Sequence, residues 1–343
     1  MSAPKLSRPD TPPDLSRSTG MNTHPDTHQA PGRARAYAQV DVFTAEALRG
    51  NPVAVVLDGD GLDAGQMQRL ACWTQLSETT FVLPPSPEAR AAGADYRLRI
   101  FTPGGELPFA GHPTLGSCHA WLQAGGQPGR PGVVLQECGV GLVTLRVDAR
   151  RSAFAAPPLQ RHDPEPALLQ AVLQALGLDP QALLAAQQLD NGPRWLGLLL
   201  ADPDRVARLE PDHARLKSLG QKVGVAAVEY GDDAPVLIAR SNREARAFGG
   251  PGPERPATGA APRGLLVRAF AAPLGVPEDP VTGSLNASLA QWLMAEGLLP
   301  ERYIATQGAA LGRHGQVYLE RDAHGQVWVG GDCVCCISGT LQL

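Results

Sequence analysis

The sequence lacks the features that mark several large classes of protein. No apolar run in its 343 residues approaches the roughly 20 that a membrane-spanning helix needs. A formal net charge of −4 provides no basic footprint for nucleic acid. The cysteines cluster only at Cys333-Val-Cys335-Cys336, with no second pair and no histidine partner at ligand spacing, so they indicate small core residues and not a metal site. We therefore expect no membrane, nucleic-acid or metal partner.

The first 35 residues lack aromatic side chains and contain six prolines. Such a segment buries too little apolar surface to offset the entropy lost on ordering, so we expect a disordered tail over residues 1–35. It also lacks the apolar core of a signal peptide. Free cysteines without a secretion signal favour a reducing compartment, and the expected location is cytoplasmic.

The sequence does contain a motif that occurs twice. In one copy Asp279, Pro280, Gly283 and Ser284 stand directly before an apolar stretch with helical spacing. Asp279 is a favourable N-cap and Pro280 a favourable first helical residue. The backbone N–H groups of Gly283 and Ser284, together with the helix dipole, would then favour a carboxylate or phosphate.

The other copy begins at His112, which stands in the place of Asp279, 167 residues earlier. It continues through Gly116 and Ser117, which match the glycine–serine pair of the second copy. A repeat of this length indicates a duplicated domain, because it is too long for a solenoid unit. Two facing helix starts would form one anion-lined cleft.

The length of the chain allows two domains of ordinary size. We expect a first half over residues 36–150 and a second half over residues 151–343, with the last strands free to pack against the first half. Further expected elements are helices over Pro166–Gly177, Asp179–Gln187 and Asp204–Leu219, and an inserted surface loop over residues 249–264.

Glu78 stands at the entrance to a strand of Thr, Phe, Val and Leu. Burial beside apolar groups raises the pKa of a carboxyl group towards neutrality, which suits a general acid and base. The alternative is a solvent-facing glutamate at a strand edge. His112 is likewise either a catalytic residue or a structural hydrogen-bonding residue.

Several ordered motifs together resemble the PhzF family, the phenazine biosynthesis-like isomerases with the diaminopimelate epimerase-like fold. The matching segments begin at Val40 and include Ser77-Glu-Thr-Thr-Phe-Val, Gly111-His-Pro-Thr-Leu-Gly and Pro277-Glu-Asp-Pro-Val-Thr-Gly-Ser. The resemblance implies an α+β fold with two pseudo-symmetric domains, each a β-barrel around a central helix. It also implies an active site between the domains and a homodimer.

The resemblance further implies that Glu78 is the main acid and base, with His112, Asp279 and Ser284 lining the site. Related epimerases have a cysteine at each helix start, whereas this chain has His112 and Asp279. The expected function is a cofactor-independent isomerase that moves a proton between carbons of a small carboxylate, such as trans-2,3-dihydro-3-hydroxyanthranilate. The alternatives are a two-base racemase or epimerase that uses His112 and Asp279, and a carboxylate-binding protein without turnover.

Overall fold

The computed structural model describes residues 32–231 and 261–343. Most of the expected tail and most of the expected 249–264 loop lie outside the described residues. The tail prediction is wrong at its last residues, because a strand begins at Ala34. Arg35 in that strand is buried and donates hydrogen bonds to the carbonyls of Asp58 and Asp60 at 2.6 and 2.7 Å. The loop prediction is wrong at its end, since residues 262–264 belong to a strand.

Seven strands of the first half and the last strand of the chain form a closed ring, in the order β1-β2-β3-β4-β6-β7-β8-β17 and back to β1. The last strand of the chain therefore closes the barrel of the first half. The elements of this half are β1 (Ala34–Val42), β2 (Asn51–Val56), α1 (Ala64–Thr74), β3 (Thr79–Leu83), α2 (Pro87–Ala91), β4 (Tyr96–Thr102), β5 (Gly105–Leu107), α3 (Gly111–Gln123), β6 (Val133–Cys138), β7 (Gly141–Val147) and β8 (Arg151–Ala155).

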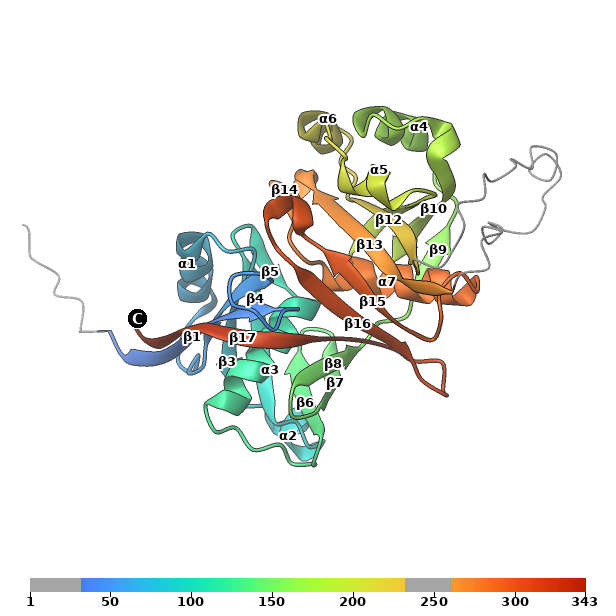
Figure 1. Ribbon diagram of the computed structural model, residues 1–343. Helices are drawn as coiled ribbons and strands as arrows, with labels where there is room; N and C mark the ends of the chain where they lie inside the picture. The colour runs from blue at the N-terminus through green and yellow to red at the C-terminus, as the bar shows by residue number, and fades with distance from the viewer. Residues whose placement is uncertain (1–31, 232–260) are drawn as a thin grey trace, which may run out of the picture.

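The strands of the second half form a sheet in the order β9-β10-β11-β12-β13-β15-β16-β17. Its elements are β9 (Gln160–His162), α4 (Pro166–Ala175), β10 (Leu183–Asp190), β11 (Arg194–Leu200), α5 (Pro203–Ala207), α6 (His213–Ser218), β12 (Val223–Tyr230), β13 (Pro262–Ala271), β14 (Val276–Asp279), α7 (Gly283–Ala295), β15 (Arg302–Gln307), β16 (Gly315–Arg321) and β17 (Val327–Gln342). Figure 1 shows β17 running from this sheet into the first half.

The helices α3 and α7 form the centres of the two halves. Nine of the thirteen residues of α3 and ten of the thirteen of α7 are buried. A helix that is apolar or small on nearly every side is stable only inside a core. Strands surround both helices, so the expected α+β fold is confirmed, with a closed barrel around α3. The division into two domains remains a prediction, because the strand pairing is continuous between the halves.

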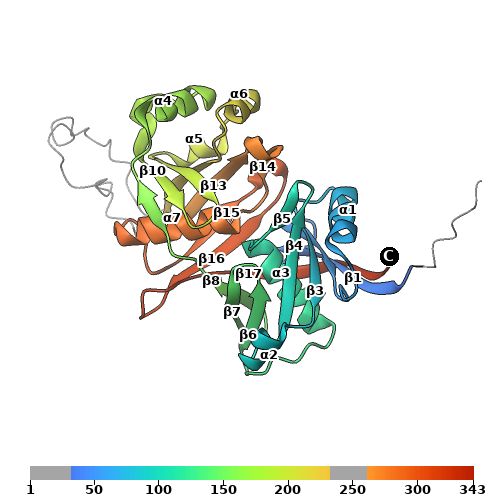
Figure 2. The ribbon, with the colours of Figure 1, turned by 180° about the vertical axis from the view of Figure 1, so that it is seen from behind.

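The sheet of the second half has a core on each face, because successive side chains of a strand point to opposite faces. On β12, Ala226 and Val228 belong to the core that contains α7. Val223 and Val225 belong to a separate core with α4 and α6. Figure 2 shows α4, α5 and α6 on the side of the sheet that faces away from the first half.

Two of the expected helices are wrong. Residues of the expected helix Asp179–Gln187 lie mainly in β10, where they pair with β11. The expected helix Asp204–Leu219 is two short helices, α5 and α6, because Pro211 interrupts it and Asp212 caps a new start through the N–H of Arg215. In the described part of the chain, no helix has the length and apolar character to cross a membrane.

Candidate active site

The first turns of α3 and α7 meet. A Cβ placed on Gly283 would lie 3.5 Å from the Cα of Gly111 and 3.5 Å from the backbone nitrogen of His112. Neither helix has a side-chain cap at its N-terminus. The N–H groups of a first helical turn have no acceptor within the helix, and the dipole makes this end positive. The positive ends of the two helices therefore lie next to each other between the two halves.

The structure corrects the predicted start of α7. Asp279 is not an N-cap, because it is the last residue of β14, where it pairs with Ala269 of β13. The N-cap position belongs to Thr282, and the helix begins at Gly283. The sheet pairing holds residues 276–279 extended, and this tertiary contact overrides the local preference for a helix start at Asp279–Pro280.

The predicted roles of Gly116 and Ser117 at the start of α3 are also wrong. The helix begins at Gly111, so both residues lie in its second turn and are buried. A Cβ on Gly116 would collide with Val42 and Val53, so this glycine lets α3 approach the strands. The Oγ of Ser117 lies 2.8 Å from the Oγ1 of Thr80, a contact that fixes α3 to β3.

These helix starts revise the internal repeat. Gly111 and His112 open α3, and Gly283 and Ser284 open α7. Both helices contain thirteen residues and begin 172 positions apart, which is five more than the spacing between His112 and Asp279. By position in the helices His112 therefore corresponds to Ser284, and the first-turn donors of α3 are those of Gly111 and His112.

Glu78 and His112 face each other at this place. The carbonyl of Glu78, just before β3, accepts from the N–H of Ala54 at 3.4 Å. Its Oε2 lies 3.4 Å from Nε2 of His112, and both side chains are largely buried, at 15% and 7% exposure. Among the described residues neither atom has a hydrogen-bond partner. Two buried polar atoms without partners are costly, and they indicate a site that a substrate completes.

Burial controls the protonation of this pair. It raises the pKa of Glu78 to about 7, against a smaller lowering by a hydrogen bond from Ser77. It lowers the pKa of His112 to about 4, although Asp279 and a hydrogen bond with the Pro52 carbonyl act in the other direction. At neutral pH His112 is therefore uncharged, and Glu78 is present in both its protonated and its ionised form.

Asp279 has both carboxylate oxygens occupied. Its Oδ1 accepts from Nδ2 of Asn51 at 2.9 Å, and its Oδ2 accepts from Oγ1 of Thr282 at 2.6 Å. Burial raises its pKa to about 6, while His112 and these hydrogen bonds lower it. Gln307 holds the same loop, since its Nε2 donates to the Asp279 carbonyl at 2.9 Å. Asp279 is thus a fixed acceptor, whereas Glu78 has an oxygen free for chemistry.

A buried ion pair supports Asp279 from the other face of the sheet. The preceding residue, Glu278, forms two hydrogen bonds with Arg268, of 2.9 and 2.7 Å. Arg268 also donates to the Leu209 carbonyl at 2.7 Å, just after α5. Adjacent residues in a strand point to opposite faces, so locking Glu278 on the α5 side fixes Asp279 on the α7 side.

Reasoning from the sequence missed three residues that hold Asp279, namely Asn51, Thr282 and Gln307. All three are at most 5% exposed. Asn51 follows a glycine and precedes a proline, and this pattern indicates only a turn. Nothing in it indicates that the Asn51 side chain donates a hydrogen bond to Asp279. The sequence signal that could have indicated them is the presence of polar residues within otherwise apolar segments.

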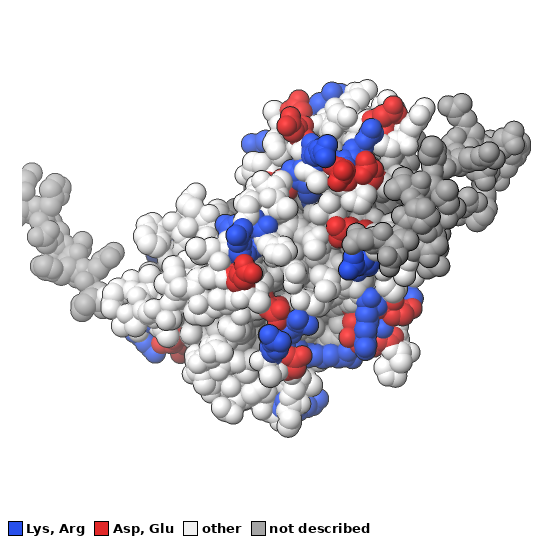
Figure 3. All heavy atoms as spheres, in the orientation of Figure 1, with Lys and Arg blue, Asp and Glu red and all other residues white. Residues whose placement is uncertain are grey.

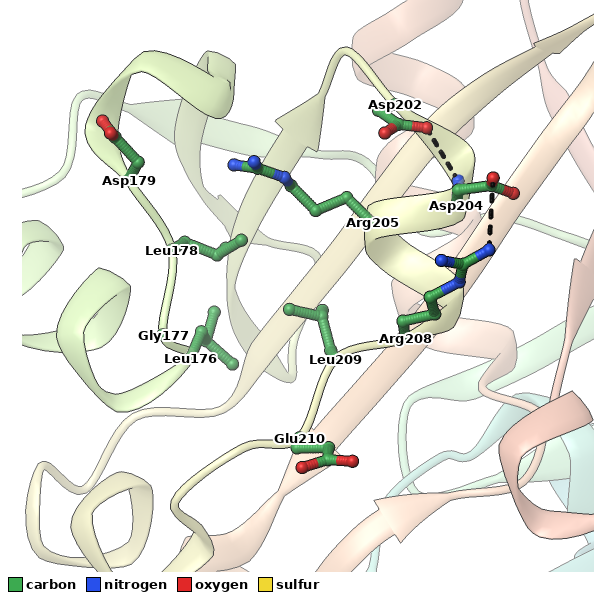
Figure 4. Close-up of a pocket in the computed structure, with 10 residues that line it drawn as sticks. All are labelled: Leu176, Gly177, Leu178, Asp179, Asp202, Asp204, Arg205, Arg208, Leu209 and Glu210. Carbon is green, nitrogen blue, oxygen red and sulfur yellow. Dashed lines mark hydrogen bonds and ion pairs between the residues drawn. The ribbon is translucent and has the colours of Figure 1, made fainter.

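A separate hollow of about 620 Å³ lies away from the helix starts. Figure 4 shows its lining beside the C-terminal end of α4, with Arg205 extending into it. Carboxylates surround it, and Asp204 pairs with Arg208 at 3.6 Å.

On the face shown in Figure 3, acidic and basic side chains are interspersed without a large field of one sign. We place the site at the helix starts because two buried acid–base groups there, Glu78 and His112, have shifted pKa values and free atoms.

A sequence model of the phenazine biosynthesis-like protein family, PhzC-PhzF, matches residues 40–339. The chain belongs to this family. The trans-2,3-dihydro-3-hydroxyanthranilate isomerase of Pseudomonas aeruginosa is 32% identical over 298 residues, which are 84% of this chain and 91% of that protein. Antisense-enhancing sequence 1 of Schizosaccharomyces pombe is 33% identical over 318 residues, 89% of this chain and 97% of that protein.

The fold is shared with a PhzF-family phenazine biosynthesis protein from Bacillus anthracis. The TM-score is 0.71 at 21% identity, with coverage of 91% of this chain and 100% of that chain. The predicted family is confirmed. The predicted class of enzyme, an isomerase, agrees with the name of the Pseudomonas aeruginosa relative.

Proposed function

We propose that this chain is a cofactor-independent isomerase that moves a proton between two carbons of a small carboxylate. The observation that carries the proposal is the pair of Glu78 Oε2 and His112 Nε2, 3.4 Å apart and without other partners in the described chain. The two helix starts beside them supply backbone donors for a substrate carboxylate. The compound named for the Pseudomonas aeruginosa relative, trans-2,3-dihydro-3-hydroxyanthranilate, is the first substrate to test.

In the proposed reaction the Glu78 carboxylate takes a proton from a substrate carbon. The electron pair left behind spreads through the conjugated system, and the protonated Glu78 returns the proton to a different carbon. One carboxyl group suffices for both steps, and a pKa of about 7 makes both directions accessible at neutral pH. Neutral His112 accepts a hydrogen bond from a substrate hydroxyl or amine, and this contact orients the ring.

The hydrogen bonds of Asp279 favour this one-residue mechanism over a two-base racemase. Both oxygens of Asp279 accept hydrogen bonds from Asn51 and Thr282, which lower its pKa, whereas Oε2 of Glu78 accepts none from the described residues. In the proposal Asp279 stabilises the positions of the loop and of the polar groups around it. Its charge also raises the pKa of His112 and so tunes the hydrogen bond to the substrate.

Incubation with trans-2,3-dihydro-3-hydroxyanthranilate in deuterated water tests the function. The expected result is a shifted double bond, followed by NMR, that depends on Glu78. A racemase would instead exchange and invert the proton α to the carboxylate of an amino or hydroxy acid. Binding without either reaction would identify a carboxylate-binding protein and overturn the proposal.

We also propose a homodimer, which the family resemblance supports. Light scattering coupled to gel filtration measures the mass in solution. The expected mass is twice the 36.1 kDa of the chain. A mass of one chain at micromolar concentration contradicts this part of the proposal without affecting the proposed chemistry.

A further inference from the structure

Lys222 is a half-buried cation of the second half that forms no ion pair with any described residue. It stands just before β12. Among the described residues, its ammonium makes no hydrogen bond and no ion pair, and it lies 4.9 Å from the centroid of the Trp195 ring. Lysine is seldom buried unless it is paired, because removing an ammonium from water is costly. A half-buried ammonium without an ion-pair partner is therefore unusual at this position.

The direction of the side chain follows from β12. Lys222 and Gly224 are two residues apart, so their side-chain directions lie on the same face of the sheet. A Cβ on Gly224 would collide with Leu285, in the first turn of α7. Lys222 thus lies on the α7 side, beyond the point where the helix begins. This is the same side as Asp279 of β14.

Trp195 joins Lys222 to the start of α7. The indole under the ammonium donates its Nε1–H to the Oγ of Ser284 at 3.2 Å. Asn191, on the turn before Trp195, donates to the carbonyl of Ser284 at 3.0 Å. Asn191 is 6% exposed, yet its Oδ1 has no partner in the described part of the chain. A free cation and a free acceptor therefore flank the second residue of α7.

The electrostatic surroundings agree with this placement. Burial lowers the pKa of Lys222, while the charges of Asp190 and Asp279 raise it. Lys222 thus lies within the field of the site around Asp279 but forms no contact that neutralises it. Asp190 is itself 3.6 Å from Arg194. An anionic ligand would supply the missing counter-charge.

We propose that Lys222 is a substrate-binding residue whose ammonium binds the carboxylate of the substrate beside the start of α7, with Asn191 Oδ1 accepting from a neighbouring substrate donor. The inference rests on the proposed function, because it assigns the carboxylate of the same substrate class. It places the anion contact on a side chain in addition to the backbone donors of Gly283 and Ser284. The carboxylate of the substrate is then held from the second half, while Glu78 and His112 act from the first.

The test compares two stable probes by isothermal titration calorimetry. One is 3-hydroxyanthranilate, an aromatic carboxylate, and the other is its neutral carboxamide. Lys222→Met and Lys222→Gln remove the cation, Lys222→Arg keeps it, and Lys217→Met removes an exposed lysine of α6 as a matched control. Circular dichroism verifies that each variant is folded.

The expected result is a loss of affinity for the acid of about tenfold or more in Lys222→Met and Lys222→Gln, which is about 1.4 kcal/mol. The carboxamide should bind all proteins alike, and Lys217→Met should match the wild type. Equal binding of the acid to wild type and both Lys222 variants overturns this inference alone. Failure of the wild type to bind the acid overturns the proposed substrate class, and this inference with it.

Discussion

The side-chain amide of Asn51 donates to Oδ1 of Asp279 at 2.9 Å and to the Val281 carbonyl at 2.8 Å. Asn51 opens β2 in the first half, and Asp279 ends β14 in the second, 228 positions later. One buried amide thus joins the strand that runs beside the Glu78 segment to the loop that leads into α7. The two halves of the site are held in register by this contact.

Asn51→Ala should reduce both stability and activity. The substitution leaves two buried acceptors without donors, which costs about 1–3 kcal/mol each. Urea unfolding and turnover measure the two effects. Gln291→Ala is the matched control, because Gln291 also donates to two carbonyls, those of Pro157 and Ala287, but lies away from Glu78. It should lose stability and keep kcat; an equal loss of kcat in both variants would contradict the role of Asn51.

Glu78→Gln should abolish turnover and leave ligand affinity nearly unchanged. The amide keeps the size and hydrogen bonding of the side chain but cannot carry the proton, and general acid–base transfer contributes roughly 10²- to 10⁴-fold. Steady-state kinetics and calorimetry with 3-hydroxyanthranilate measure the two effects. A kcat near that of the wild type would remove Glu78 from the mechanism.

The same variant should become more stable than the wild type as the pH rises. The pKa of Glu78 is about 7 in the folded chain and 4.5 without burial. A raised pKa stabilises the fold below the unfolded value, and this contribution is lost as the pH rises through the folded value. Between pH 5 and 8 the wild type should lose up to about 3 kcal/mol relative to Glu78→Gln. A difference in unfolding free energy that is independent of pH would show that Glu78 is solvated.

Asp279→Asn should bind a carboxylate as well as the wild type or better, yet turn over at least about tenfold more slowly. It removes a negative charge near the bound anion, and an amide can still accept from Asn51 and donate to Thr282. The charge that raises the pKa of His112 is also lost. Calorimetry and single-turnover kinetics separate binding from chemistry. Weaker binding with unchanged turnover of bound substrate would place the chemistry elsewhere.

Arg268→Met should cost about 3–5 kcal/mol, because it leaves the buried carboxylate of Glu278 unpaired. It should also lower kcat, since Glu278 precedes Asp279 in β14. Arg302→Met breaks an exposed pair with Glu320 of similar length, 2.7 Å, and should cost at most about 1 kcal/mol. Chemical denaturation measures both. A kcat that stays low in the double variant Arg268→Met/Glu278→Gln, which has no unpaired charge, would confirm the positioning role, and a wild-type kcat there would contradict it.

The predictions made from the sequence succeed where the signal is local or carried by ordered motifs. The apolar stretches of α3 and α7, the family and the strand after Glu78 belong to this group. The Glu78 segment could be proposed as a site because a carboxyl group before an apolar strand is visible in a few residues. The facing helix starts could be proposed because the motif occurs twice.

Only the tertiary structure decided where those helices begin and which atoms face the site. Pairing of Asp279 with Ala269 in the sheet excludes it from the helix that its own neighbours favour. Gly116 lets α3 approach Val42 and Val53, and the Ser117 hydroxyl forms a hydrogen bond with the hydroxyl of Thr80. Asn51 reaches Asp279 across 228 residues. Lys222 lies beside α7 because β12 packs on Leu285 through Gly224. Local propensity is a sum over neighbours in the chain, whereas these placements depend on contacts between distant segments, which only the folded sheet brings together.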